Sequence, residues 1–251
     1  MKITFLGTGD FYGNPRYGDL WHNGVDENNS KNTRLRYSIL LDDIENQLLI
    51  DCSPDFRQQS IIHKIKNFSD VFYTHYHRDH IGGTFELEKY SKINKKHINL
   101  WADSETLREL NMNFSWTLKD KEKFSLNEIH PFEEHKIANM NIIPLKFTHG
   151  TLNTYGMKYK NTVISADAGT IPEENYPYLE NLDLWIMECE NIEPTHVGTH
   201  FHLDLALEMI NKFKPKMAIF THFGWEWDYE IMNKKLPKGI EMAYDGMIVE
   251  V

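Results

Sequence analysis

The chain has 251 residues, of which 41% are hydrophobic and 25% charged, and its formal net charge is -10. This composition is typical of a folded, soluble protein, and no apolar stretch reaches the roughly 18 residues that a membrane-spanning helix needs. The negative charge disfavours non-specific binding of nucleic acid, which is itself a polyanion. We therefore expect neither a membrane nor a nucleic acid as a partner.

The N-terminus and the cysteines bear on where the protein works. Residues 1–7 form an apolar run that is too short for the core of a signal peptide and lacks a small-residue cleavage site. Only two cysteines occur, Cys52 and Cys189, which makes a disulfide framework unexpected in a chain of this size. Both observations predict a cytoplasmic protein.

Short apolar and β-branched runs recur along the chain between helical and turn signals. In chain order, these runs predict strands at residues 3–6, 35–41, 47–50, 71–74, 98–101, 142–148, 155–159, 162–166, 184–187, 217–221 and 247–251. Strands that dominate, with helices between them, predict an α+β fold in which helices cover the outer faces of the sheets.

Helical patterns and polar segments complete this outline. Helices are predicted at 54–66, 104–112 and 204–213, with Asp204 as the N-cap of the last one. The polar segments 13–33 and 119–141 are expected to be loops and not linkers between independent domains. We therefore expect a single catalytic domain over residues 1–251.

The strongest chemical signal is the segment HYHRDH at residues 75–80, which directly follows an apolar run. It offers four side chains that bind metals, namely His75, His77, Asp79 and His80. Imidazole is the commonest protein ligand of zinc and also suits manganese and iron, while a carboxylate adds negative charge. So dense a set of ligands predicts metal binding, and the two glycines that follow permit a tight turn into a helix.

Three further residues of ligand type stand directly after predicted strands: His149, Asp167 and His222. Taken singly, each is as well explained by an ordinary surface position. Ligands brought together from separate strand ends are, however, what a rigid site in a β-rich scaffold requires. Together with the loop, they predict one metal centre of seven residues.

The order HxHxDH, then His149, Asp167 and His222, resembles the metallo-β-lactamase superfamily over nearly the whole chain. The resemblance implies a four-layer αββα sandwich with the site at one edge, between the sheets. It also implies two divalent metal ions. The first would be bound by His75, His77 and His149, the second by Asp79, His80 and His222, and Asp167 would bridge them. Asp51 matches a carboxylate that usually orients a ligand.

Three motifs resemble the phosphodiesterase branch of this superfamily, and in particular the phosphoribosyl 1,2-cyclic phosphate phosphodiesterases of phosphonate breakdown. They are GTG at 7–9, HLDL at 202–205 and DGM at 245–247. The resemblance implies hydrolysis of a small cyclic phosphodiester, which is the expected small-molecule partner.

In that family a histidine two residues before a helix-capping aspartate is the general acid, and His202 occupies this position. We assign His202 and the ligand Asp79 to catalysis, with His200 and His196 as rivals of His202. Two metal ions about 3.5–4 Å apart would lower the pKa of a shared water, and His202 would protonate the departing alkoxide. The ligand set suits zinc, manganese and iron alike, so the sequence leaves the metal open.

One departure from this family concerns residues 13–22. Family members carry a structural zinc in a Cys-rich loop there, completed by a histidine three residues beyond the last metal ligand. Here the loop has no cysteine, and the residue three positions after His222 is Trp225. We therefore predict no structural zinc in this loop. Other contacts are expected to hold it, with Trp21, Trp225 and Trp227 as candidates.

Other readings stay open. A tRNA 3′-processing endonuclease shares the ligand motif but needs a protruding basic arm, and this acidic chain has no such insertion. Thioester hydrolysis of the glyoxalase II type uses the same ligands, with the His202 region as the main feature against it. Arg34, Arg36 and Ser38 are weak candidates for the substrate side. The aromatic residues Trp225, Trp227 and Tyr229 would form a homodimer interface or close the core.

Overall fold

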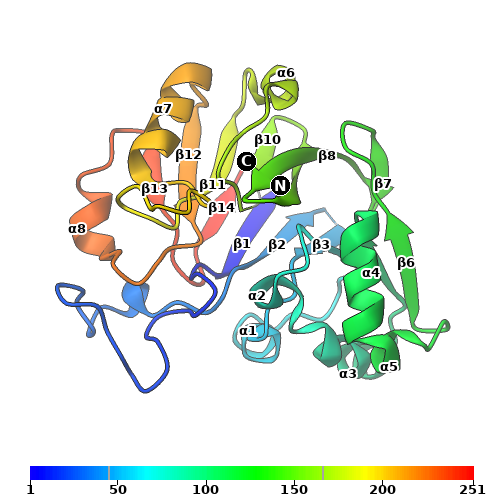
Figure 1. The fold of residues 1–251 in the computed structure, drawn as a ribbon. Helices are drawn as coiled ribbons and strands as arrows, with labels where there is room; N and C mark the ends of the chain where they lie inside the picture. The colour runs from blue at the N-terminus through cyan, green and yellow to red at the C-terminus, as the bar shows by residue number, and fades with distance from the viewer. Residues whose placement is uncertain (45, 166) are drawn as a thin grey trace.

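Two seven-stranded sheets pack face to face in the computed structural model, which describes residues 1–44, 46–165 and 167–251 (Figure 1). The first sheet has the spatial order β14 (Ile248–Glu250), β1 (Lys2–Gly7), β2 (Ser38–Asp43), β3 (Asn46–Ile50), β4 (Asp70–Phe72), β5 (Ile98–Ala102) and β6 (Phe124–Glu128). Strands β3 to β6 are parallel, whereas β14, β1, β2 and β3 pair antiparallel.

The second sheet repeats this plan with the other half of the chain. Its spatial order is β13 (Ile240–Met242), β12 (Met217–Thr221), β11 (Leu184–Glu188), β10 (Thr162–Ile164), β9 (Leu152–Tyr159), β8 (Met140–His149) and β7 (His135–Ile137). Strands β10 to β13 are parallel, so their carboxyl ends lie along one edge of the sheet.

Helices lie on both outer faces and make the outer two of four layers. Those of the first half are α1 (Phe56–Ile62), α2 (Arg78–Ile81), α3 (Thr84–Asn94), α4 (Ser104–Asn113) and α5 (Ser115–Leu118). Those of the second half are α6 (Tyr176–Leu179), α7 (Leu203–Phe213) and α8 (Tyr229–Asn233), with short 3-10 turns at Ser30–Asn32 and Glu173–Asn175. Within the described residues, no helix has the length and apolar character to cross a membrane.

Three apolar layers hold the four structural layers together. Between the sheets, Ile39 and Ile50 of the first sheet share a cluster with Met157 and Ile186 of the second. The opposite faces of the same strands pack against helices, so strand residues alternate between two cores, as the period of two in a strand requires. This arrangement confirms the α+β, four-layer αββα sandwich expected from the resemblance.

Several element boundaries differ from the sequence prediction, in part because polar residues made two strands resemble a loop. The segment 119–141, expected to be a loop, contains β6 and β7, which are edge strands with solvent-facing polar side chains. The helix predicted at 54–66 covers only Phe56–Ile62. Strand β10 ends at Ile164, and Ala166, the predicted strand end, lies outside the described residues.

The predicted cap of α7 is also wrong. The extended N-cap position belongs to His202, and Asp204 lies inside the first turn. There the carboxylate faces the positive end of the helix dipole, a favourable position for an acid that does not cap the helix.

Candidate metal centre

The histidine-rich loop runs from the carboxyl end of β4 into α2, so it starts at the edge where parallel strands end. His75 and His77 precede α2, and Asp79 and His80 lie within it. Close packing under this loop requires glycine at position 83, where a Cβ would lie 2.1 Å from the carbonyl oxygen of Ser53. The glycine is thus needed for space and not for a positive φ, since its φ is −81°.

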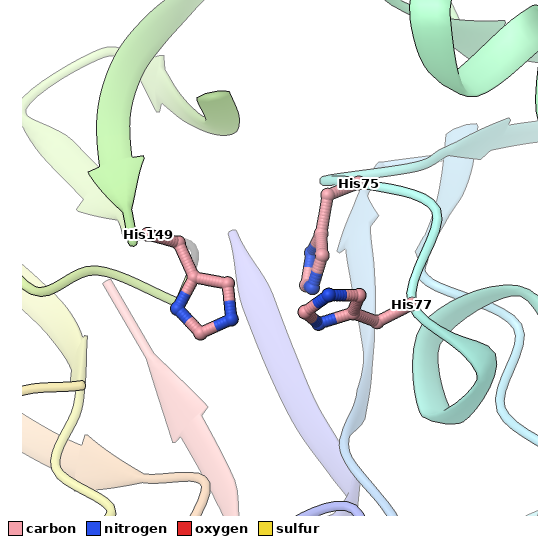
Figure 2. Close-up of side chains that lie close together, drawn as sticks. All are labelled: His75, His77 and His149. Atoms are coloured by element: carbon pink, nitrogen blue, oxygen red, sulfur yellow. The ribbon is translucent and has the colours of Figure 1, made fainter. Parts of the chain in front are cut away.

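His75, His77 and His149 form the first group of ligand-type residues, drawn from both halves of the sandwich. His149 ends β8, and Figure 2 shows its ring facing those of His75 and His77 across the gap between the halves. One ring nitrogen from each lies within 4.8 Å of the others. The structure therefore brings together three residues that are up to 74 positions apart in the sequence (149 − 75).

The second group contains Asp79, His80, Asp167 and His222, all buried. The Nε2 atom of His80 lies 3.1 Å from Oδ2 of Asp79 and 3.2 Å from Oδ2 of Asp167. Nε2 of His222 lies 3.4 Å from each of the same two oxygens. Oδ2 of Asp167 is also 3.8 Å from Nε2 of His75, so this one atom faces both groups.

Further hydrogen bonds fix the orientation of the rings. Asp51 Oδ2 lies 2.7 Å from Nδ1 of His80, and Asp51 also accepts hydrogen bonds from the backbone and hydroxyl of Thr74. Nδ1 of His149 donates to the carbonyl oxygen of Thr199 at 2.7 Å. Each contact occupies Nδ1 and leaves Nε2 as the ligand atom, the arrangement usual for metal-binding histidine. Asp51 thus has the orienting contact that the sequence analysis assigned to it.

Backbone geometry at the site is unusual. His222, directly after β12, has a φ of 58°, and Asp51, directly after β3, has a φ of 57°. Non-glycine residues seldom adopt this left-handed conformation, and such residues cluster at functional sites.

The charges in the second group depend on one another. Burial acts to raise the pKa of Asp167, but the imidazoles of His222 and His80 outweigh it and hold the pKa well below its usual value. Burial likewise acts to lower the pKa of His222, but Asp167 and Asp79 raise it to about 10. Two buried carboxylates therefore require positive charge beside them, which protons on histidine or metal cations both provide.

In the first group, neighbouring charges do not outweigh the effect of burial on the histidine pKa values. Burial is the main cause that lowers the pKa of His75, and the same holds for His77 and His149. These rings are therefore neutral at neutral pH, which is the state that binds a metal. The buried atoms Nε2 of His75 and Oδ1 of Asp79 have no hydrogen-bond partner among the described residues. Open donor atoms of this kind fit two divalent cations of the zinc, manganese or iron type.

The structure separates the three histidines proposed for acid catalysis. His200 lies beside both groups, with its ring centroid 4.4 Å from that of His149 and 5.4 Å from that of His222. His202 occupies the N-cap position of α7 and belongs to none of the ligand-type groups found in the described residues. His196 lies in an exposed loop.

Two acidic residues that the sequence analysis missed hold His200 in place. Nδ1 of His200 lies 3.5 Å from Oε1 of Glu188, and Nε2 lies 3.1 Å from Oε2 of Glu190. Burial acts to lower the pKa of His200, but Glu188 and then Asp167 and Glu190 raise it to about 9. Glu188 ends the strand β11, so the rule that identified His149 and His222 at strand ends would have found it.

A hollow of about 330 Å³ borders Asp79 of the second group, and Arg36 lines it. Arg36 thus stays a candidate for the substrate side. The other two candidates from the sequence, Arg34 and Ser38, are buried. Arg34 donates to the carbonyl oxygen of Trp227, and the Ser38 hydroxyl donates to that of Asp51.

Contacts with the segment after His222 hold the N-terminal loop. The guanidinium of Arg16 lies 4.1 Å from the ring centroid of Trp225, and the His22 ring packs edge-on against the same indole. Trp227 accepts the hydrogen bond from Arg34. Of the three expected tryptophans, Trp225 thus contacts the loop, whereas the contact of Trp227 is with Arg34, beyond the loop. Trp21 Nε1 donates to Asp19 of the loop itself.

Several known proteins are similar to this chain in sequence or in structure. The family model described as "Beta-lactamase superfamily domain" matches residues 46–223. A crystal structure of a diphosphatase from the PhnP family superposes with a TM-score of 0.89 at 28% identity, covering 100% of this chain and 97% of that one. A UPF0173 metal-dependent hydrolase of Nanoarchaeum equitans is 27% identical over 82% of this chain and 91% of its own length.

A second curated relative is longer. An octanoyltransferase of Porphyromonas gingivalis is 25% identical over 98% of this chain. The match covers 51% of that protein, so the present chain spans about half the length of this relative.

Proposed function

The chain belongs to the beta-lactamase superfamily of metal-dependent hydrolases, and on that premise we propose that it cleaves small phosphodiesters or diphosphates with two divalent metal ions bound. The observation that carries this proposal is that both ligand groups face the same atom, Oδ2 of Asp167. His200, which contacts the carboxylate of Glu190, lies beside these groups. The similarity to a PhnP-family diphosphatase supports phosphorus chemistry. Phosphoribosyl 1,2-cyclic phosphate is the first cyclic substrate to try.

The seven ligand residues would hold the two ions in the division expected from the sequence. His75, His77 and His149 would hold one and Asp79, His80 and His222 the other, with Asp167 between them. When bound, two such ions supply Lewis-acid chemistry, which lowers the pKa of a water nucleophile and neutralises phosphoryl oxygens. Asp51 and Thr199 keep the rings of His80 and His149 in position for this role.

We assign the general acid to His200 in place of His202. The carboxylates of Glu188 and Glu190 lie 3.5 Å and 3.1 Å from its two ring nitrogens, and such neighbours raise the pKa of His200 and favour its protonated form. Its ring lies against those of His149 and His222, within the reach of a substrate bound at the ligand groups. Proton donation to a departing alkoxide contributes typically about 10²- to 10⁴-fold to the rate.

The test is turnover by the zinc- or manganese-loaded protein of cyclic phosphates, linear phosphodiesters and diphosphates, together with a thioester and a tRNA precursor. In His200→Ala, kcat should fall about 10²- to 10⁴-fold for alkoxide leaving groups and far less for 4-nitrophenoxide, which needs no proton. The matched variant His202→Ala should stay within a few-fold of the wild type. Turnover of only the thioester or the tRNA, with two metals bound, would refute the proposal.

A further inference from the structure

The hollow beside Asp79 contains two arginines, and these differ in what they contact. Its lining is Phe11, Tyr17, Arg36, Pro54, Asp55, Arg78 and Asp79. Two guanidinium groups therefore lie there with two carboxylates. What the hollow can bind depends on which of these charges is already paired.

Arg36 is already occupied by the protein itself. Its Nη1 lies 2.9 Å from Oδ1 of Asp55, its Nε donates to the carbonyl oxygen of Phe11, and its Nη2 donates to the hydroxyl of Tyr17. Its charge is therefore neutralised by Asp55. Its structural effect is to fix Phe11 and Tyr17 at the rim of the hollow.

Arg78 is free by contrast. Its side chain is exposed and has no hydrogen-bond or ion-pair partner within the part of the chain that the structure describes. It directly precedes the ligand-type residue Asp79, and it also borders a neighbouring hollow of about 420 Å³ with Tyr76 and Phe85. That second hollow contains none of the seven ligand-type residues. Arg78 therefore borders one hollow that includes a ligand-type residue and one that does not.

We propose that Arg78 binds a second anionic group of the substrate, separate from the phosphorus that is attacked. This inference rests on the proposed function and names the residue that would bind the further phosphate of a substrate such as phosphoribosyl 1,2-cyclic phosphate. Guanidinium binds a phosphate through two parallel hydrogen bonds, and an unpaired one keeps all its donors available for this. The exposed ring of Tyr17, with 78% of its surface accessible, offers a stacking face to a ring of the same substrate.

A pair of chromogenic substrates isolates this contact. Thymidine 5′-(4-nitrophenyl phosphate) and its 3′-phosphorylated form share the scissile bond and leaving group and differ only in the second phosphate. In the metal-loaded wild type the 3′-phosphorylated substrate should have the lower KM. In Arg78→Gln its KM should rise about tenfold, while kcat for both substrates and KM for the other stay within twofold.

Two further variants sharpen this result. Arg78→Lys keeps the charge without the two-pronged geometry and should recover only part of the KM difference. Arg57→Gln removes an exposed arginine from α1, outside the hollow, and should leave both substrates unchanged. An equal loss for both substrates in Arg78→Gln would overturn the inference, because it would indicate a general disturbance of the site.

Binding separates a failure of this inference from a failure of the proposed function. If the wild type cleaves neither of these substrates nor any other phosphodiester or diphosphate of the panel, the proposed function fails, and calorimetry still tests Arg78. Thymidine 3′,5′-bisphosphate should bind the metal-loaded wild type more tightly than thymidine 5′-phosphate does, and Arg78→Gln should abolish that difference. Equal affinities of the wild type for the two nucleotides would overturn the role of Arg78.

Discussion

Asp51 illustrates how a residue outside the ligand groups controls the site. Its side chain is fully buried, contacts Nδ1 of His80, and accepts hydrogen bonds from the backbone N–H and the hydroxyl of Thr74. Burial, the largest influence, raises the pKa of its carboxyl above the usual value, although His80 opposes it. The carboxylate therefore depends on the charge of the His80 ring, and the ring on the carboxylate for its orientation.

We predict that Asp51→Asn weakens metal binding about 10- to 100-fold, because the His80 ring loses the acceptor that fixes its orientation. Competition with a chromogenic chelator measures this affinity. The control is Asp42→Asn, which changes a partly exposed carboxylate of β2 that pairs with Lys2 and Gln47. Unchanged metal affinity in Asp51→Asn would show that the ligands need no such support.

Asp245 gives a prediction about pH. Burial raises its pKa to about 7 against the opposing hydrogen bonds from Leu35 and Thr8. Between about pH 4 and pH 7 the folded chain therefore holds a proton that the unfolded chain has released, so rising pH lowers the stability contribution of this group. Below and above that window, both states carry the same charge and the contribution is constant.

Asp245→Asn should remove this slope, because the amide does not titrate. Urea unfolding at about pH 5 and about pH 8 should show a smaller difference between the two pH values for the variant than for the wild type. The variant should also be less stable at about pH 5, since Leu35 or Thr8 loses an acceptor. An unaltered pH dependence would contradict the raised pKa of Asp245.

At the scale of elements, Asn32 holds the N-terminal loop through several buried hydrogen bonds. Asn32 is fully buried, and its amide donates to Asp228 and to the carbonyl oxygen of Asp26. Its side-chain oxygen accepts from the backbone of Tyr229 and from Arg34. The loop is thus tied to the first turn of α8 by polar contacts that exclude water.

Asn32→Ala should lower the free energy of unfolding by about 2–4 kcal/mol, because several buried polar groups lose their partners at once. Equilibrium unfolding in urea measures this change, and limited proteolysis should show earlier cleavage within residues 10–34. Asn28→Ala, at an exposed position of the same loop, should change stability by no more than about 0.5 kcal/mol. Similar effects of the two variants would mean that Asn32 does not anchor the loop.

For the whole molecule, the ligand groups connect the two halves of the sandwich. The loop after β4 belongs to the first sheet, whereas His149 and His222 end strands of the second. A bound ion would therefore cross-link the two sheets. It would stabilise only the folded chain, in which these ligands meet.

Metal should accordingly raise the melting temperature. At a free metal concentration about 100 times the Kd, the folded state should gain about 2.7 kcal/mol. Calorimetric scans of chelator-treated protein with and without zinc or manganese measure this gain. The variant His149→Ala should show a smaller shift, and equal melting temperatures with and without metal would show that the groups bind no ion in the folded state.

The aromatic residues near the C-terminus close the core of the chain itself. Trp227 is fully buried and Tyr229 is 7% exposed, whereas Trp225 is partly covered by Arg16 and His22. The argument that these side chains form an interface therefore loses its basis. A homodimer stays a prediction, for which sedimentation is the direct measurement.

The sequence by itself predicted sheets covered by helices and offered the seven ligand-type residues, because apolar runs that end in a histidine or aspartate and the dense HYHRDH segment are local information. The four-layer αββα sandwich and the division of the ligands followed from the resemblance to the metallo-β-lactamase superfamily. Only the tertiary structure decided how these residues meet. His80 and Asp167 are 87 positions apart, and no local pattern specifies their 3.2 Å approach.

Tertiary contacts also distinguish residues of the same type that are close together in the sequence. His200 and His202 are two residues apart and equivalent in chemistry, but only His200 meets Glu188 and Glu190. Arg34 and Arg36 also alternate along one segment, yet Arg34 is buried and donates to the carbonyl oxygen of Trp227, whereas Arg36 lines the hollow beside Asp79. Side chains two residues apart share a chemical type in the sequence, but which of them is buried depends on packing against distant segments.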